Sequence, residues 1–388
     1  MPTPKRILIL FSDTGGGHRS AGEAIAEAFK AEYRHRYQPI LVDALKEYTP
    51  HPLCDLPHLY PDMVRIPAAW GFGYRLLNGR RRSAVVSRAM WRYAQRISRR
   101  LVEQHRPDMI LSVHPLIHSA MLPRSQRARI PFVTMVTDMV SVHSLWYQSQ
   151  CDLWLVATES ARKRALEAGV NEEKVRVVGM PVSRRHSQAP GSPSTLRREL
   201  GWPEDLPMVL LMGGGEGMGP LYQTVEALSR LPHRIGLVVV TGRNDGLKHR
   251  IQGVNWPVPV YVYGFEKRLS KMMRAATLLV TKAGPGTITE AVNAGLPMVL
   301  VDRLPGQEDG NVAYVVNHGM GEWAPGPQRA AAAVASYLSQ PEKIRTASQT
   351  CLRIARPDAA IQIVRNVDSL FKVREEHAIT YPTLTLAD

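Results

Sequence analysis

Short apolar runs alternate with helical stretches along most of the chain, and this alternation restricts the fold more than any other feature. The runs are rich in Val, Ile and Leu, as is typical of parallel strands that are buried on both faces. They cover residues 5–12, 39–45, 108–114, 131–138, 153–158 and 175–182, and then 208–212, 235–241, 258–263, 278–281 and 298–301. The pattern predicts an α/β protein with two doubly wound parallel sheets and a cleft between them, in which ligands bind beyond the carboxyl ends of the strands.

The composition changes between residues 183 and 207, where Pro, Ser and Gly become frequent. We interpret this segment as a linker, since 388 residues are enough for two domains. This gives an N-terminal domain at residues 1–185 and a C-terminal domain at 186–356. Residues 357–388 follow, and their apolar positions have helical spacing, so we expect a helix that packs back across the lobes, then a tail.

The chain is strongly basic. It carries 49 Lys and Arg against 34 Asp and Glu, a formal net charge of +15, which favours a nucleic acid, an anionic membrane surface or a phosphorylated substrate as partner. Its three cysteines suit a reducing compartment and make neither a disulfide framework nor a Cys-x-x-Cys site. The N-terminal apolar run is too short for a secretion signal, and no run of eighteen apolar residues follows. We therefore expect a cytoplasmic protein that meets a membrane only from the side.

Residues 65–106 hold most of the net charge. Eleven arginines stand against one acid, Glu103, which gives a local charge of +10. Five aromatic residues are interleaved with them: Trp70, Phe72, Tyr74, Trp91 and Tyr93. A solvated basic helix, a nucleic-acid-binding surface and an amphipathic surface for anionic lipid head groups all have this composition.

The first glycine-rich turn, Ser12–Ile25, follows a strand and begins a helix. Glycines let the backbone approach a ligand, and the helix start offers unpaired N–H groups. The turn matches neither the P-loop nor the G-x-G-x-x-G pattern. His18 lies where the helix begins, and the positive end of a helix lowers an imidazole pKa, which suits a general base. A helix-capping histidine explains the same position equally well.

Two further glycine turns open helices in the second half. Leu210–Leu221 is rich in glycine and lacks lysine, which favours a diphosphate held by backbone N–H groups. In Thr281–Val315, Glu290 lies one turn into a helix, where a carboxylate can accept two ribose hydroxyls. The next loop offers Gln307, Glu308 and Asn311 to the hydroxyls of a sugar. The alternative is a solvated helix acid and a polar turn.

These segments carry a family resemblance. Gly284–Glu290 with the following Gly-Leu-Pro turn resembles the donor-nucleotide motif of GT-B glycosyltransferases. A closer resemblance, to the monogalactosyldiacylglycerol synthase family in glycosyltransferase family 28, extends from Ser12 to Gly321. Its motifs are SDTGGGHR, VTD at Val136–Asp138, GGGEGMGP, KAGPGTI-x-EA and PGQE-x-GNV-x-YVV. The tract SVHSLW departs from the pattern, because Ser144 stands where we expect proline.

The resemblance implies a GT-B fold with two Rossmann-like domains, the N-terminal one for acceptor and membrane, the C-terminal one for a UDP-sugar. It implies an inverting transfer of a hexose, with galactose favoured, to the hydroxyl of diacylglycerol without metal or cofactor. His18 would be the base, and Asp138 would orient or compensate it. The implied donor-binding residues are Gly214, Gly215, Glu216, Gly217, Met218, Gly219, Phe265, Gly284, Pro285, Gly286, Thr287, Glu290, Gln307, Glu308 and Asn311. The implied acceptor or membrane residues are Gly16, Gly17, Trp70, Arg80, Arg81, Arg82, His143 and Trp146.

The partners that follow are a UDP-hexose, diacylglycerol and anionic lipids at the inner face of the cell membrane, and no nucleic acid. A lipid acceptor favours the interfacial interpretation of residues 65–106. Glucose stays open as the donor sugar, since galactose and glucose differ at one stereocentre. Transfer of N-acetylglucosamine to another lipid, such as lipid I, also stays open. A UDP-sugar epimerase would share the fold but would leave residues 65–106 unexplained.

Overall fold

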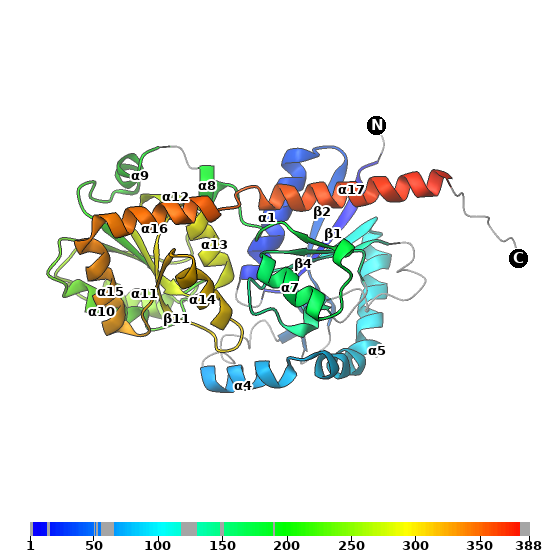
Figure 1. The fold of residues 1–388 in the computed structure, drawn as a ribbon, viewed down its shortest axis with the longest axis horizontal. Helices are drawn as coiled ribbons and strands as arrows, with labels where there is room; N and C mark the ends of the chain where they lie inside the picture. Colours follow the sequence, from blue (N-terminus) through cyan, green and yellow to red (C-terminus); the bar gives the residue numbers. More distant parts are fainter. Residues whose placement is uncertain are drawn as a thin grey trace, which may run out of the picture.

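A computed structural model describes residues 3–13, 16–49, 51, 53–55, 66–117, 130–147, 151–188 and 191–380. Within these residues the chain forms two parallel sheets that lie side by side, one in each half of the sequence (Figure 1). The first has the order β2-β1-β3-β4-β5-β6 and the second the order β12-β11-β10-β7-β8-β9. Each sheet with its helices is called a lobe below. This arrangement agrees with the two doubly wound sheets that the apolar runs predict.

The strands follow the predicted runs closely. Those of the first lobe are β1 (Lys5–Phe11), β2 (Tyr37–Asp43), β3 (Met109–Ser112), β4 (Phe132–Val136), β5 (Leu153–Val156) and β6 (Val175–Val177). Those of the second lobe are β7 (Met208–Met212), β8 (Gly236–Val240), β9 (Val260–Tyr263), β10 (Leu278–Lys282), β11 (Met298–Asp302) and β12 (Gly321–Trp323). Only β12, three residues long at a sheet edge, has no counterpart among the predicted runs.

The helices cover both faces of each sheet. Those of the first half are α1 (Gly17–Glu32), α2 (Ala44–Tyr48), α4 (Pro67–Leu77), α5 (Arg80–His105), α7 (Glu159–Glu167) and α8 (Arg185–Gln188), with the 3₁₀ turns η1 (Leu53–Asp55), η3 (Ser144–Tyr147) and η4 (Glu172–Lys174). Those of the second half are α9 (Pro193–Leu200), α10 (Leu221–Ser229), α11 (Asp245–Gln252), α12 (Leu269–Ala275), α13 (Pro285–Asn293), α14 (Asp309–Asn317), α15 (Pro327–Ser339), α16 (Pro341–Ile354) and α17 (Ala359–Thr380).

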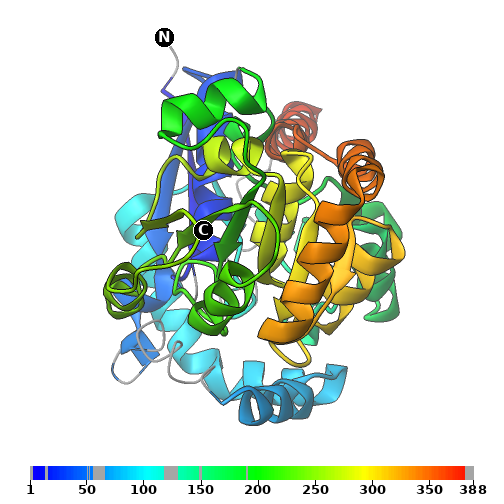
Figure 2. The ribbon, with the colours of Figure 1, turned by 90° about the vertical axis from the view of Figure 1, so that its left-hand side faces the viewer.

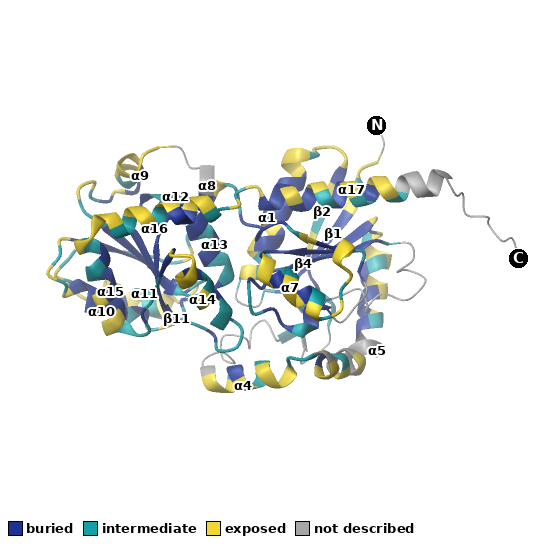
Figure 3. Ribbon diagram, viewed as in Figure 1, coloured by how far each residue is buried: buried dark blue, intermediate teal, exposed yellow. Residues whose placement is uncertain are grey.

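Side chains of β1 show how the first sheet is buried on both faces. Leu8 and Leu10 pack into the cluster that includes α5, whereas Ile7 and Ile9 pack into the cluster that includes α1 and α17. All four are at most 2% exposed, and Figure 3 shows most of the strands of both lobes as buried. Because neither face of the strand meets water from Ile7 to Phe11, the sequence of that part is continuously apolar.

The C-terminal helix α17 leaves the second lobe and packs on the first (Figure 1). Ile363, Val364 and Val367 are fully buried against α1 and the first sheet, and the Tyr37 hydroxyl donates a 2.6 Å hydrogen bond to Asp368. Burial of three such side chains contributes on the order of 5–9 kcal/mol before the entropy cost of ordering. The helix is therefore part of the N-terminal lobe in space.

The segment interpreted as a linker contains α9. Ser192 caps this helix through its side chain, and Gly201 ends it in the left-handed conformation with φ +71°. Leu196 and Leu200 lie four residues apart on one face and are buried in the core of the second lobe, as is Trp202. The polar composition reflects the exposed face of this helix, so most of the segment is structured and belongs to the second lobe.

Candidate functional site

His18 lies where three strand ends of the first lobe meet. It is the second residue of α1, after Gly16, whose φ of +79° is the left-handed conformation that glycine adopts without strain. Its Nδ1 lies 2.8 Å from the carbonyl oxygen of Val113, which follows β3, and 2.9 Å from the hydroxyl of Thr137, which follows β4. Positions 14 and 15 of this glycine-rich turn lie outside the described residues.

These contacts define the state of the imidazole. A carbonyl oxygen only accepts, so Nδ1 carries the proton and Nε2 carries the lone pair in the neutral ring. Burial lowers the pKa of His18 to about 4, and the nearby Asp13 opposes this only partly. The ring of His114 lies edge-on to His18, with 4.6 Å between centroids. His18 is therefore a neutral imidazole with an unprotonated Nε2, which is the form that accepts a proton.

Asp138 has partners other than His18. Its Oδ2 accepts hydrogen bonds from the indole N–H of Trp146 at 2.8 Å and from the backbone N–H of His143 at 3.2 Å, and burial raises its pKa to about 6. Among the described residues no hydrogen bond joins it to His18, whose Nδ1 is held by Val113 and Thr137 instead. The structure thus corrects the expected pairing: Asp138 braces the segment 141–147.

Two of the expected acceptor residues lie inside the first lobe. Trp146 is 1% exposed and bonds to Asp138, so this tryptophan contacts core residues instead of membrane. His143 is also buried, and its ring lies edge-on to Tyr74 at 4.7 Å. Ser144, at the position where proline was expected, accepts a 2.6 Å hydrogen bond from the N–H of Gly79 and so joins this segment to the corner between α4 and α5.

The basic segment forms a surface of α4 and α5. Its described arginines are exposed: Arg75, Arg81, Arg82, Arg88, Arg96, Arg99, Arg100 and Arg106. Large apolar side chains are exposed beside them: Ile66 (64%), Phe72 (69%), Leu76 (49%), Leu77 (43%) and Val85 (65%). Trp70 is half-buried, and the side chains of Arg80, Trp91 and Tyr93 lie outside the described residues. The second half of α5 packs on the sheet through Ala94, Ile97 and Leu101.

The glycine turn after β7 has a shape that only glycine permits. A Cβ on Gly213 would lie 2.0 Å from the carbonyl oxygen of Met218, and one on Gly217 would lie 2.2 Å from that of Thr241. Gly214, Gly217 and Gly219 all have positive φ. The turn is therefore a tight backbone loop at the carboxyl end of the second sheet, as a diphosphate site requires.

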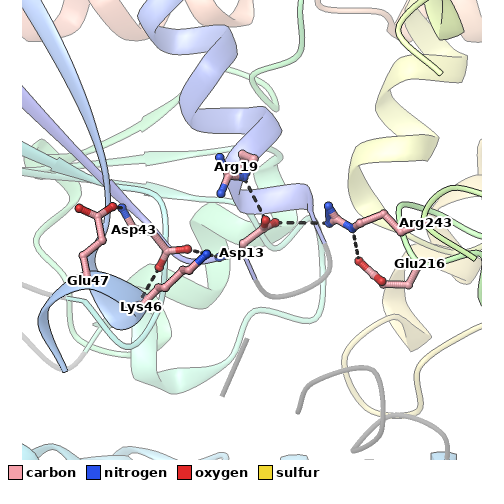
Figure 4. Close-up of polar contacts among 7 residues, drawn as sticks. All are labelled: Asp13, Arg19, Asp43, Lys46, Glu47, Glu216 and Arg243. Atoms are coloured by element: carbon pink, nitrogen blue, oxygen red, sulfur yellow. Dashed lines mark hydrogen bonds and ion pairs between the residues drawn. The ribbon is translucent and has the colours of Figure 1, made fainter. Parts of the chain in front are cut away.

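Arg243, which follows β8, connects this turn to the first lobe. Its Nε donates a 2.9 Å hydrogen bond to Glu216, and its Nη2 forms an ion pair with Asp13 at 3.5 Å (Figure 4). Asp13 also accepts from Arg19, and its backbone N–H donates to Asp43 at the end of β2. The turn that holds His18 and the donor turn thus lie next to each other. Phe265 is 66% exposed, with the Arg243 guanidinium 5.7 Å from its ring centroid.

Helix α13 begins at the third glycine turn. Pro285 is its first residue and no side chain caps it, so the N–H groups of Gly286 and Thr287 lack partners within the helix. Space is open around Gly286, where an added Cβ would meet nothing within 4 Å. One turn further, burial raises the pKa of Glu290 to about 7, and its Oε1 lies 3.7 Å from Nε2 of His186.

The loop before α14 separates the three residues assigned to the sugar. Glu308 is 2% exposed, and its carboxylate accepts from Lys282 Nζ at 2.5 Å and from the N–H of Leu304 at 2.8 Å. It therefore holds the loop, which corrects its expected contact with the sugar. In contrast, Asn311 Oδ1 and Gln307 Oε1 are buried without a hydrogen-bond partner. A buried oxygen without a donor is costly, and each of these two oxygens is a hydrogen-bond acceptor that the protein itself leaves unused.

Sequence reasoning missed four residues of this region: Asp13, Thr137, Arg243 and Lys282. Three of them stand within or directly beside quoted motifs, so only their partners were hidden. Arg243 stands outside every motif, and no local pattern signals a side chain whose partners are 27 and 230 residues away.

One group of described residues has the composition of a metal site, namely His51, Cys54 and Asp55. Their ligand atoms lie within 4.8 Å of one another, with Cys54 and Asp55 on the short turn η1 and His51 before it. The group includes none of the residues around His18 or the glycine turns.

The family comparisons match both lobes. Residues 18–182 match the monogalactosyldiacylglycerol synthase family, and residues 208–342 match the C-terminal domain of glycosyltransferase family 28. The chain is 38% identical over 383 residues to monogalactosyldiacylglycerol synthase 2 from Arabidopsis thaliana. The aligned region covers 95% of this chain and 82% of the relative. The enzyme from Spinacia oleracea is 37% identical over 384 residues, covering 95% and 73%.

This chain belongs to the monogalactosyldiacylglycerol synthase family. It is a family 28 glycosyltransferase, and its membership supports galactosyl transfer to diacylglycerol. Solved structures share the fold: MurG from Acinetobacter baumannii (15% identity, TM-score 0.58, 94% of this chain and 100% of that one) and HepE from Anabaena with UDP-glucose (18%, 0.58, 94% and 99%). The expected GT-B fold is confirmed.

The same comparison contradicts the expected location. The relatives from Arabidopsis thaliana and Spinacia oleracea are named as chloroplastic enzymes. This overturns the expectation of a cytoplasmic protein at the inner face of the cell membrane. The cysteine count, on which that expectation partly rested, does not distinguish one reducing compartment from another. Within the described residues, no helix is long and apolar enough to cross a membrane.

Proposed function

We propose that this member of the family transfers galactose from UDP-galactose to the free hydroxyl of diacylglycerol, with inversion at the anomeric carbon and without a metal ion. The observation that carries the proposal is the state of His18. Its Nδ1–H is fixed by the carbonyl of Val113, so Nε2 is the basic atom. The turn that holds His18 lies next to the donor turn, because Asp13 forms an ion pair with Arg243.

In this mechanism the acceptor hydroxyl attacks the anomeric carbon while Nε2 of His18 takes its proton. The bond between that carbon and the β-phosphate oxygen breaks, and UDP leaves. The two products are β-galactosyl-diacylglycerol and UDP, and His18 then returns its proton to water. Negative charge on the bound diphosphate favours the imidazolium, which compensates for the low pKa of His18 in the unliganded protein.

Backbone N–H groups meet the charge of the leaving group. Gly286 and Thr287 at the start of α13 offer theirs to an anion at the helix N-terminus. In the Gly214–Gly219 turn the N–H groups of Gly217 and Met218 bond to carbonyls of the turn itself, so Gly214 and Gly215 supply the N–H groups there. The ammonium group of Lys282, which is paired with Glu308, lies beside Gly284, 3.3 Å from the position of an added Cβ there. Glu290 accepts from the ribose, Phe265 borders the uracil, and Gln307 and Asn311 accept from the hexose.

The surface of α4 and α5 faces the membrane in this proposal. Exposed arginines attract anionic head groups, and the exposed side chains of Phe72 and Leu76 enter the acyl boundary. The enzyme thus binds the membrane peripherally and takes its acceptor from it. No part of the proposal uses nucleic acid.

The decisive experiment offers UDP-galactose or UDP-glucose with diacylglycerol in anionic vesicles and determines the anomeric configuration of the product by NMR. We expect a β-galactolipid, at a rate that EDTA leaves unchanged. An α-linked product would remove the inverting mechanism, and a glucolipid would reassign the donor. Activity abolished by EDTA and restored by Mg²⁺ or Mn²⁺ would show that a metal, and not the N–H groups, supports the leaving group.

A further inference from the structure

The loop assigned to the donor sugar rests on the first lobe as well as on its own. The backbone N–H of Gly310, the second residue of α14, donates a 2.9 Å hydrogen bond to the side-chain oxygen of Ser141. The fit is tight, because a Cβ on Gly310 would lie 2.7 Å from that oxygen and 2.7 Å from a methyl carbon of Val140. Both partners follow β4, three residues or fewer beyond Asp138.

Helix α4 makes a second contact with the same loop. A Cβ on Gly71 would lie 2.8 Å from Cβ of Pro305, and one on Gly306, whose φ is +84°, would lie 2.9 Å from the ring of Tyr74. The hydroxyl of Tyr74 donates a 2.8 Å hydrogen bond to the backbone oxygen of Ser141. Figures 1 and 2 show α4 beneath the lobes, next to the loop that leads into α14.

Ser141 is where the two contacts meet. Its backbone oxygen is held by Tyr74, and its side-chain oxygen holds Gly310. The loop between β11 and α14 is therefore enclosed by groups of the first lobe on one side and by the Lys282–Glu308 pair of its own lobe on the other.

We propose that Tyr74, Ser141 and Gly310 form an interlobe clamp that positions Gln307 and Asn311, so that residues of the acceptor lobe set the affinity and selectivity for the donor's hexose. The inference rests on the proposed function of this loop. Tyr74 and Ser141 are positioning residues, since they act through the loop and touch no reacting atom.

The clamp affects hexose binding through two oxygens without hydrogen-bond partners, Oδ1 of Asn311 and Oε1 of Gln307. Asn311 is 1% exposed, its Nδ2 donates to the carbonyl of Ala283, and its Oδ1 has no partner; Oε1 of Gln307 is likewise buried and unpaired. Selection between two epimers depends on whether a hydroxyl meets such an acceptor within hydrogen-bond distance. A small shift of the loop therefore changes hexose binding, whereas UDP alone, which lacks the hexose, does not contact these groups.

The test compares the binding of UDP with that of UDP-galactose in Ser141→Ala, Tyr74→Phe and Gly310→Ala, by calorimetry without acceptor. Loss of one hydrogen bond should weaken UDP-galactose binding about 3- to 10-fold, and UDP binding should not change. The kcat/KM ratio of UDP-galactose to UDP-glucose should fall in the same variants. Alanine is the better helix former, so Gly310→Ala keeps α14 intact and acts through its collision with Ser141.

Two controls match the substitutions. Tyr147→Phe removes a tyrosine hydroxyl that donates to the carbonyl of Ala161 at 3.1 Å within the first lobe alone. Gly246→Ala changes the second residue of α11, where an added Cβ meets only Asn244 Oδ1 at 3.8 Å. Neither should alter the ratio of UDP to UDP-galactose affinity.

A fourth variant, at a residue of the loop itself, separates this inference from the proposed function. Gln307→Ala removes a group assigned directly to the hexose, so it should weaken UDP-galactose binding if the loop reads the sugar. If Gln307→Ala acts and the three clamp variants do not, the clamp is refuted and the loop's function stands. If none of the four changes the ratio of affinities, the loop does not read the sugar and both are refuted. Equal weakening of UDP and UDP-galactose in the clamp variants would show a general loss of lobe packing and would also refute the clamp.

Discussion

His18 is oriented by residues of other strands. Val113 O and the Thr137 hydroxyl both contact Nδ1, so the direction of Nε2 depends on two strand ends that lie 95 and 119 residues further along the chain. A histidine at the start of a helix could equally have been a cap. The carbonyl partner decides between these interpretations, because it fixes which nitrogen is basic.

We predict that His18→Ala lowers kcat by roughly 10²–10⁴-fold, the usual contribution of a general base, and leaves the affinity for UDP unchanged. Steady-state kinetics and calorimetry measure the two effects, and added imidazole should restore part of the rate. Thr137→Val should cost less, since Val113 still holds the ring. A turnover close to that of the parent would return His18 to a structural role.

Glu290 is the second residue whose chemistry is decided by burial. Glu290→Gln should weaken UDP binding by about 1–3 kcal/mol, the scale of hydrogen bonds to a charged group. A UDP analogue without the ribose hydroxyls, 2′,3′-dideoxyuridine 5′-diphosphate, should bind the parent and the variant equally. An unchanged UDP affinity in the variant would contradict the ribose contact.

The same residue makes stability depend on pH. Its pKa is about 7 in the folded protein against 4.5 in the unfolded chain, so the unfolded state releases the proton first as the pH rises. Stability due to this group is therefore full below pH 4.5 and is lost between 4.5 and about 7, by on the order of 3 kcal/mol. Thermal unfolding from pH 5 to 8 should show a decline that is smaller in Glu290→Gln. Parallel curves for the two proteins would mean that Glu290 titrates normally.

At the scale of elements, α5 has two parts with different neighbours. Its second half buries Ala94, Ile97 and Leu101 on the sheet, while its first half carries exposed arginines next to the exposed apolar side chains of α4. A solvated basic helix has no reason to expose Phe72, Leu76 and Val85 together, so the structure favours an interfacial surface.

Replacing Arg80, Arg81 and Arg82 with Ala should weaken binding to anionic vesicles by up to about 1 kcal/mol per residue at low salt, and less at high salt. Co-sedimentation measures this effect. Activity on membrane-embedded diacylglycerol should fall with it, and activity on a dissolved short-chain acceptor should be kept. The matched control replaces Arg230, Arg234 and Arg345, which are exposed on the second lobe. Equal loss of both activities would indicate damage to the fold of the first lobe.

In the molecule as a whole, contacts between the lobes hold the turn of His18 next to the donor turn. Arg243 joins the turn of His18 to the donor turn through Asp13 and Glu216 (Figure 4), and α17 ties the chain end to the first lobe. The Arg243 side chain is 40% exposed, so this pair adds little to stability. The pair holds the turn of His18 next to the turn after β7.

Asp13→Asn should therefore lower kcat/KM about 3- to 10-fold, which corresponds to roughly 1 kcal/mol, with the melting temperature nearly unchanged. Arg19→Gln is the control, because it removes a partner of Asp13 that lies in the same lobe. The difference between the two variants should shrink at high ionic strength, where such exposed pairs are screened. Equal rates in both variants would show that the pair across the lobes has no kinetic effect.

Local sequence patterns were enough to predict every strand but β12, the three glycine turns and the family, because each is encoded over a few neighbouring residues. Periodic apolar runs report burial of a strand on both faces, and a run of glycines reports a backbone that must bend or approach closely. His18, Glu290, Gln307 and Asn311 stand within such motifs, so the local pattern is enough to single them out.

The side-chain partners became known from the packing of the folded chain. That packing paired Asp138 with Trp146 and Glu308 with Lys282, and it placed Ser141 against Gly310. It also formed α9 within a segment of polar composition. These partners come from distant parts of the chain, so no local spacing encodes them. A side-chain contact depends on how sheets and helices pack, and the burial that shifts the pKa of His18 or Glu290 exists only once that packing has formed.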